Sequence, residues 1–174
     1  VDTLMPAQNA TIYGKVTCHG VPVSGVVVSD GLVCGRTDGK GVYNLKSAKR
    51  NGLVFISVPS GYVTPYNGST VPSFWKSLKK LKDEPERVDF TLEAENQDRY
   101  TMLFMGDIHL YSNKSISCFN STFIPEINSY VSSPVSGPVY ASTLGDMTWD
   151  WYWYNGDKIG IEQYILNMNN IRGL

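Results

Sequence analysis

The chain has 174 residues, enough for one ordinary domain or two small ones, and its 42% hydrophobic and 18% charged residues are typical of a globular protein. A net charge of −1 provides no field that would attract nucleic acid or an anionic membrane, so neither is expected as a partner. No uninterrupted apolar run of about 18 residues is present, so no transmembrane segment is expected.

Residues 1–95 are expected to form a β-sandwich module. Asp30-Gly31 and the Asp38-Gly39 pair provide tight turns, and Pro59 ends one of the apolar runs. Short segments with alternating or β-branched character lie between such turns, at residues 11–17, 26–29, 42–45, 53–58 and 88–92. Regular short strands with this punctuation are typical of a sandwich of two sheets.

Two features of this first half leave alternatives open. Residues 73–82, with apolar side chains spaced by three, are the segment of this half that is compatible with a short helix. Cys18 and Cys34 fit either a disulfide between neighbouring strands or two small buried thiols. The three cysteines, which include Cys118, have no metal-ligand spacing, so they do not predict a zinc site.

The chain changes character near residue 96. The stretch 93–98 is polar and has no large apolar residue, and residues 96–174 contain thirteen of the 21 aromatic residues. We therefore expect two domains, at residues 1–95 and 96–174.

The second half is expected to alternate strand, helix, strand and helix. Residues 100–105 form a nearly continuous apolar run, the pattern of a strand buried on both faces, and residues 139–144 form a second strand. Residues 115–131 fit a helix in which Pro125 predicts a kink or a late start. A second helix at residues 159–170 has Ile161, Tyr164, Ile165 and Met168 on one face. The order predicts parallel strands, and thus a partial α/β segment.

The same dipeptide follows both strands of this half. The first strand leads into Gly106-Asp107-Ile108-His109, and the second leads into Gly145-Asp146. Because loops at the carboxyl ends of parallel strands form the ligand crevice, Asp107, His109 and Asp146 are expected to converge. Each glycine is expected to permit a sharp turn. Two carboxylates and an imidazole suit a divalent metal such as Zn, Mn or Fe, whereas the alternative is a pair of ordinary turns beside a surface histidine.

Five aromatic residues lie within six positions directly after the second of these motifs. The tryptophans of this run either form the wall of a substrate pocket or pack against other parts of the protein. They are Trp149, Trp151 and Trp153.

Asp107-x-His109 followed by Gly145-Asp146-x-x-x-Asp150 resembles the first two motifs of calcineurin-like metallophosphoesterases. The resemblance implies that Asp107 and His109 bind one metal and that Asp146 bridges two divalent ions (Mn, Fe or Zn), which hydrolyse a phosphate ester. Asp150 matches the trailing aspartate that supports the loop, and a role as a helix cap is an equally good interpretation. Gly106 and Gly145 would support the same motifs.

The first half resembles sandwiches of the transthyretin and carboxypeptidase-regulatory type, also described as Ig-like. The resemblance lies in Gly14-Lys-Val-Thr17, in the segments 22–28 and 37–43, and in Pro59-Ser-Gly-Tyr62. Such a module joined to a calcineurin-like domain is similar to exported phosphoesterases of the Bacteroides type. This similarity implies export to the periplasm or cell envelope. A start at Val1 without a leader fits a mature secreted protein and equally a trimmed chain.

The chain departs from the family pattern after His109. The Gly-Asn-His-Asp/Glu motif and the later Gly-His-x-His histidines do not occur. The chain alone is therefore expected to bind metal weakly or not at all, to have no complete catalytic group and to be inactive. The rest of the catalytic domain and a phosphate-ester substrate are its expected partners in the full-length protein.

Two other hypotheses stay open at this point. The sandwich is either a non-catalytic binding or interaction module of the cell envelope, or a purely structural unit that shields and orients the catalytic domain. The substrate, the metal and the oligomeric state are not predicted by the sequence.

Overall fold

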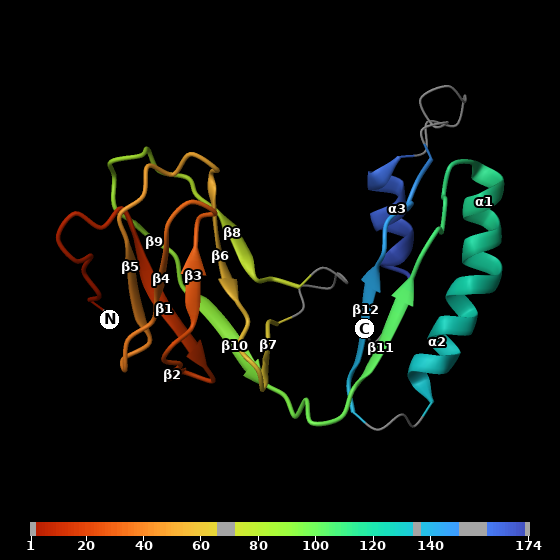
Figure 1. Ribbon diagram of the computed structural model, residues 1–174, viewed down its shortest axis with the longest axis horizontal. Helices are drawn as coiled ribbons and strands as arrows, with labels where there is room; N and C mark the ends of the chain where they lie inside the picture. The colour runs from red at the N-terminus through yellow and green to blue at the C-terminus, as the bar shows by residue number, and fades with distance from the viewer. Residues whose placement is uncertain (1–2, 66–71, 134–136, 150–159, 173–174) are drawn as a thin grey trace. The chain divides into compact units, whose positions relative to one another are not determined.

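The computed structural model describes residues 3–65, 72–133, 137–149 and 160–172, and these fall into two compact units. Among the described residues, the first unit runs to Glu95 and the second begins at Asn96. Each unit has its own hydrophobic core. In Figure 1 the first unit is drawn from red to yellow-green and the second from green to blue.

The first unit is a β-sandwich. One sheet has the order β2-β1-β10-β7, with β5 and β9 also paired to β1, and the other has the order β4-β3-β6-β8. The strands of the first sheet are β1 (Ile12–Cys18), β2 (Val21–Pro22), β5 (Val42–Leu45), β7 (Tyr62–Val63), β9 (Glu86–Arg87) and β10 (Phe90–Ala94). Those of the second are β3 (Val27–Ser29), β4 (Cys34–Arg36), β6 (Leu53–Ser57) and β8 (Trp75–Ser77).

Alternation along the strands creates the core between the sheets. Ile12 and Val16 of β1 are fully buried, and so are Val28 of β3 and Val54 of β6. At Gly14 of β1 a side chain is impossible, since a Cβ would lie 1.9 Å from the carbonyl oxygen of Val88. The predicted sandwich module is thus present.

The predicted turns form as their side chains dictate. The Asp38 carboxylate accepts hydrogen bonds from the backbone N–H groups of Lys40 and Val42, at 2.8 and 2.9 Å. Asp30 does the same for Leu32 and Val33 in the hairpin that joins β3 to β4. Aspartate is favoured at such positions because its short side chain reaches its own backbone.

Residues 73–82, which were compatible with a short helix, do not form one. Trp75 to Ser77 form β8, which pairs antiparallel with β6, and residues 78–82 are not helical. The backbone N–H groups of Lys79 and Lys80 donate to the carboxylate of Glu86 instead of to carbonyl oxygens of a preceding helical turn. Pairing and a distant carboxylate thus override the helical spacing.

The cysteines of the first unit are free thiols. Cys18 lies on β1 and is partly buried, whereas Cys34 lies on β4 and is exposed. The structure therefore contains neither the disulfide nor a pair of fully buried thiols.

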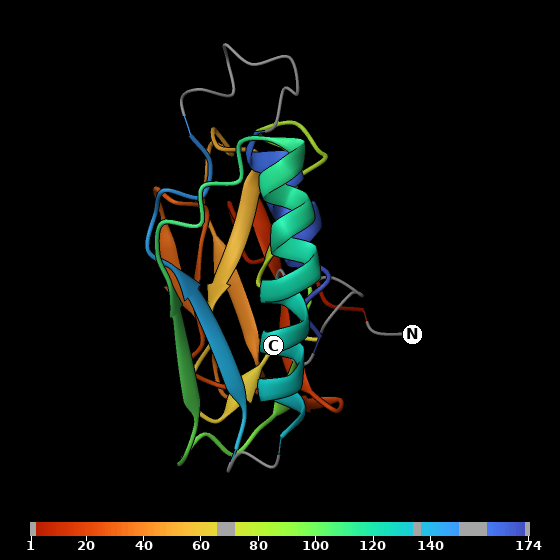
Figure 2. The same ribbon diagram turned by 90° about the vertical axis from the view of Figure 1, so that its right-hand side faces the viewer.

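The second unit contains β11 (Thr101–Met105), α1 (Asn113–Cys118), the π-helical segment η1 (Phe119–Phe123), α2 (Ile124–Ser132), β12 (Val139–Thr143) and α3 (Ile161–Met168). Strands β11 and β12 are parallel, with Thr101 opposite Val139 and Met105 opposite Thr143. Figures 1 and 2 show α1, η1 and α2 as one rod that runs in the opposite direction to β11, with α3 on the same side of the strands. Asn120 of the rod donates to Asn167 of α3 at 2.6 Å, so the helices are neighbours.

The rod accommodates Pro125 through a π-helical segment that the sequence did not predict. It begins at Asn113, so the late start is wrong, and Ser112 caps it by accepting a hydrogen bond from the backbone of Ser115. A π-helical segment, in which the N–H of Ile124 bonds to the carbonyl of Phe119, precedes the proline. The wider turn falls where Pro125 provides no N–H and where its ring would meet a carbonyl in a regular α-helix.

Only one face of the two-stranded sheet is covered by described residues. Met105 is buried in a core with Phe119 and Ile124 of the rod and with Tyr164 of α3. The opposite face carries exposed apolar side chains at Tyr100, Met102, Phe104 and Leu144. The expected burial of β11 on both faces is therefore wrong for this part of the protein.

Helix α3 shows the same one-sided pattern. Tyr164 and Met168 are buried, as expected, but Ile161 and Ile165 are exposed. No described helix is long and apolar enough to cross a lipid bilayer.

Candidate metal centre

The parallel pairing of β11 and β12 brings both Gly-Asp motifs to one edge of the sheet. The backbone ladder continues past the strand ends, since the N–H of His109 donates to the carbonyl of Asp146 and that of Leu110 donates to Met147, both at 3.0 Å. Leu110 is 1% exposed and belongs to the core. The two loops are therefore held together by backbone bonds and by one buried side chain.

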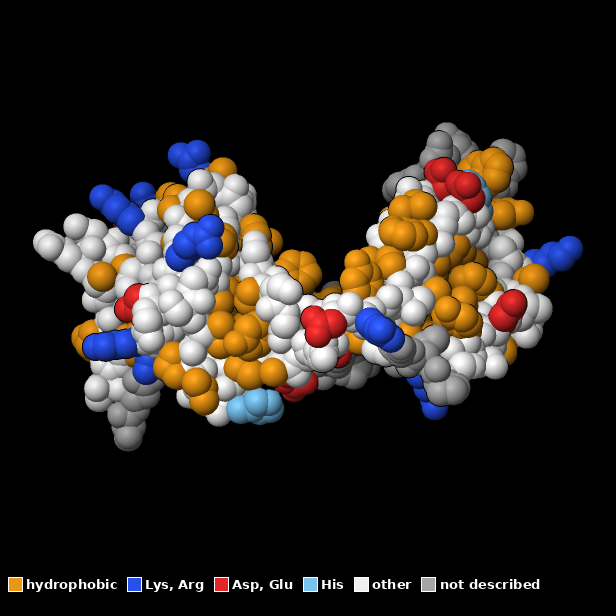
Figure 3. All heavy atoms as spheres, turned by 60° about the horizontal axis from the view of Figure 1, so that its bottom comes forward, with side chains coloured by type: hydrophobic (Ala, Val, Ile, Leu, Met, Phe, Trp, Pro, Cys, Tyr) orange, Lys and Arg blue, Asp and Glu red, His pale blue; other side chains and the backbone are white. Residues whose placement is uncertain are grey.

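Asp107, His109 and Asp146 lie together at this edge. One potential ligand atom of each residue lies within 4.8 Å of the others. The Nε2 atom of His109 is 3.8 Å from Oδ1 of Asp107. Both aspartates are exposed, whereas the His109 side chain is partly buried at 31% exposure. Figure 3 shows acidic side chains (red) beside a histidine (pale blue) at one end of this unit.

The backbone of these three residues is unusual. Asp107, His109 and Asp146 have φ angles of 53°, 48° and 46°, in the left-handed region that side chains disfavour. They are the only non-glycine residues of the described part of the second unit with a positive φ. Residues held in this region cluster at functional sites, because the surrounding structure must hold them there.

The glycines contribute unequally to this geometry. Gly145 has a φ of 112°, a conformation suited to glycine. Gly106 has no positive φ, and the turn expected there is made by Asp107 instead. Open space surrounds the position of a Cβ at either glycine.

The donor set fits a divalent cation. Two carboxylates and one imidazole are the mixed oxygen and nitrogen ligands that Zn, Mn and Fe accept. The Nδ1 atom of His109 is buried and has no hydrogen-bond partner among the described residues. A buried polar atom without a partner in the protein requires another explanation, such as an ion or water. Within the described ranges these residues form one group of this kind.

Aromatic side chains lie against the group. The Trp149 ring packs on the His109 ring with centroids 4.8 Å apart, and the Tyr111 ring meets Trp149 edge-on at 5.8 Å. Trp149 is thus placed beside the group, an arrangement that fits both alternatives for this residue, a pocket wall and packing within the protein. Tyr111 was missed by sequence reasoning, although its position two residues after His109 places it in the same loop. Asp150, Trp151 and Trp153 lie outside the described residues.

A comparison with known protein families finds a match for the first unit. No curated protein matches the chain. Residues 10–95 match the family model described as the N terminal of calcineurin-like phosphoesterase. The match covers the sandwich and ends at the boundary between the two units. The first unit is therefore the N-terminal domain of a calcineurin-like metallophosphoesterase.

Proposed function

We propose that the chain is the N-terminal part of an exported, metal-dependent phosphoesterase, in which Asp107, His109 and Asp146 provide the first metal ligands. The observation that carries the proposal is that these three side chains converge, each from a left-handed backbone position. The match of residues 10–95 to a phosphoesterase N-terminal domain supports it independently. Residues 96–174 are then the first part of the catalytic domain.

The three candidate ligands come from two loops of the sheet edge. Asp107 and His109 come from the loop after β11 and Asp146 from the loop after β12, so an ion held between them would fasten both strand ends. A bound divalent ion polarises a phosphoryl oxygen and neutralises charge that develops there. Both aspartates are exposed, which suits ions that still need further ligands.

The exposed apolar face of β11 and β12 supports a further part of the proposal. Phe104 and Leu144 are each 66% exposed on that face. Large contiguous apolar surfaces usually mark interfaces. We propose that the rest of the catalytic domain covers this face in the full-length protein. The transthyretin-like type of the sandwich and the location in the periplasm or cell envelope belong to the same proposal.

Isothermal titration of the full chain with Mn²⁺ tests the proposed site. We expect weak binding of one ion per chain, and we expect Asp107→Ala and His109→Ala each to weaken binding at least tenfold. His19→Ala is the matched control, because His19 is the only other histidine and lies in the first unit. Circular dichroism checks that every variant is folded. Equal heats from the native chain and all three variants would contradict a metal site at this position.

A further inference from the structure

Two exposed aromatic rings lie directly beside the candidate metal ligands. Trp149 is 52% exposed and Tyr111 is 37% exposed, yet both rings are in contact with neighbours. Trp149 packs on His109, which is itself one of the candidate ligands, with the rings tilted by 47°. Trp149 and Tyr111 therefore form an aromatic surface that directly contacts His109, one of the three candidate metal ligands.

The backbone holds the two halves of this surface together. Tyr111 follows β11 and Trp149 follows β12, and the bonds from His109 to Asp146 and from Leu110 to Met147 join the two loops. The N–H of Tyr111 also donates to the hydroxyl of Ser115, in the first turn of α1, at 3.1 Å. The position of the aromatic surface relative to the metal group is thus determined by hydrogen bonds within this unit.

The chemistry of the surface complements that of the metal group. Asp107 and Asp146 are acidic, so they contribute nothing to the binding of an anionic ester except through a cation. An indole face attracts a flat ring independently of charge, by stacking and by removing apolar area from water. A ligand with both a phosphoryl group and a ring would therefore engage both parts of the site.

We propose that Trp149, supported by Tyr111, binds the ring of a phosphoester whose phosphoryl group lies at Asp107, His109 and Asp146. The site then selects ring-bearing phosphoesters over small alkyl ones. This inference rests on the proposed function, since the phosphoryl group needs the metal site. The ring is an aromatic ring or the flat apolar face of a sugar, both of which stack on indole.

Titration of the Mn²⁺-saturated full chain with three probes tests the inference. Phenylphosphonate represents an aromatic ring, glucose 1-phosphate represents a sugar, and methylphosphonate has no ring. We expect at least one ring-bearing probe to bind about tenfold more tightly than methylphosphonate, in line with base stacking on aromatic side chains. The probe with the larger advantage identifies the source of the ring.

Substitution at Trp149 then assigns the preference to this residue. Trp149→Leu is expected to lose the ring advantage and to keep the methylphosphonate affinity, whereas Trp149→Phe keeps part of the advantage. Trp75→Leu is the matched control, because Trp75 is 45% exposed and lies in the first unit. The Mn²⁺ affinity of each variant is measured in parallel to show that the metal group is intact.

The possible failures separate the two proposals. Normal Mn²⁺ binding with an equal ring advantage in Trp149→Leu and the native chain overturns the inference and leaves the metal site standing. Normal Mn²⁺ binding without any ring advantage does the same. The absence of Mn²⁺ binding by the native chain overturns the metal site on which the proposed function depends in this chain and, with it, this inference.

Discussion

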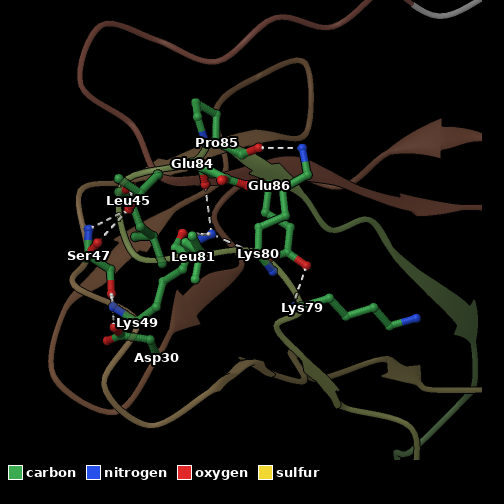
Figure 4. A network of polar contacts seen from close by, with 11 residues as sticks. Asp30, Leu45, Ser47, Lys49, Lys79, Lys80, Leu81, Glu84, Pro85 and Glu86 are labelled. Carbon is green, nitrogen blue, oxygen red and sulfur yellow. Dashed lines mark hydrogen bonds and ion pairs between the residues drawn. The ribbon is translucent and has the colours of Figure 1, made fainter.

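At the scale of single residues, a network of buried polar side chains stabilises one end of the sandwich (Figure 4). The Lys49 ammonium group donates to the carbonyls of Leu81 and Glu84 and pairs with the Glu86 carboxylate at 3.2 Å. The Lys49 side chain is 3% exposed. A buried charge is tolerated only when it is paired and hydrogen-bonded in this way.

Two carboxylates at this end of the sandwich, those of Asp30 and Glu86, have altered pKa values. Burial by itself raises the pKa of Asp30, but hydrogen bonds from the Ser47 hydroxyl and from nearby backbone amides outweigh burial and hold the pKa below its usual range. Burial likewise opposes ionisation of Glu86. The amides of Lys79 and Lys80, followed by the side chain of Lys49, reverse the effect and lower the pKa of Glu86.

The lowered pKa values predict acid sensitivity of the first unit. Unfolded Asp and Glu titrate near pH 4, so the stabilisation is complete above about pH 5. It is lost as the pH falls through the lower folded-state pKa values, because the unfolded chain binds more protons there. Asp30→Asn is expected to lower the free energy of unfolding by about 1.5–3 kcal/mol at pH 7, with a smaller difference from the native chain at pH 3.

Urea unfolding at pH 7, 5, 4 and 3 checks this expectation. Asp83→Asn is the control, since the Asp83 side chain is 86% exposed, and it should follow the native curve. A constant difference between Asp30→Asn and the native chain across the whole range would contradict the assignment.

At the scale of elements, hydrogen bonds of asparagine side chains join the rod to α3 and to the residues just after it. Asn120 of η1 donates to Asn167 at 2.6 Å and accepts from Asn170 at 2.8 Å. Asn128 of α2 donates to the carbonyl of Asn170 and accepts from the N–H of Arg172. Because η1 presents Asn120 from the widened π turn, the irregular segment contributes a contact between helices.

Asn120→Ala is expected to lower the free energy of unfolding of the second unit by about 1–3 kcal/mol. The substitution removes the bond to Asn167 of α3 and the bond to Asn170 just after that helix, and it leaves both amide groups without this partner. Ser121→Ala is the control on the same segment, because its hydroxyl is exposed and bonds only locally, to Cys118 at 3.3 Å. Chemical denaturation followed by circular dichroism measures both variants, and equal stabilities would show that these hydrogen bonds contribute little.

The elements that the sequence predicted well are those governed by local rules. Strands such as β1 and β10 follow from alternation, and the Asp38 turn follows from its own side chain. Strand β8 was not predicted, and its segment was compatible with a helix, because its structure depends on β6 and on Glu86, which no local spacing reveals. The π turn before Pro125 was missed for a different reason, since the sequence signals the proline but not how the chain accommodates it.

The candidate site was predictable to a similar degree. Parallel strand ends meet at one edge, so the convergence of Asp107, His109 and Asp146 followed from topology. The left-handed backbone of these residues was not predictable, because it depends on the bonds between the two loops. Tyr111 carried no motif signal, and only the packing of Trp149 reveals its place.

On the scale of the whole molecule, the chain is two units with separate cores and unequal shielding. The sandwich encloses fully buried residues such as Phe90 and Leu92 between its sheets. The second unit covers one face of a two-stranded sheet and leaves Phe104 66% exposed. Since stability follows buried apolar area, the second unit is expected to be the less stable of the two.

Urea unfolding of the full chain should therefore occur in two steps, with the second unit unfolding first.

Lys49→Met is expected to lower only the stability of the first unit, by about 3–5 kcal/mol, because it leaves the Glu86 charge buried without its partner. Mn²⁺ at ten times its dissociation constant should raise only the stability of the second unit, by about 1.4 kcal/mol. The control for Lys49→Met is Lys46→Met, since Lys46 is exposed and lies three residues before Lys49. Tryptophan fluorescence and far-ultraviolet circular dichroism report the two steps, and a single transition that responds to both changes would show that the units unfold as one.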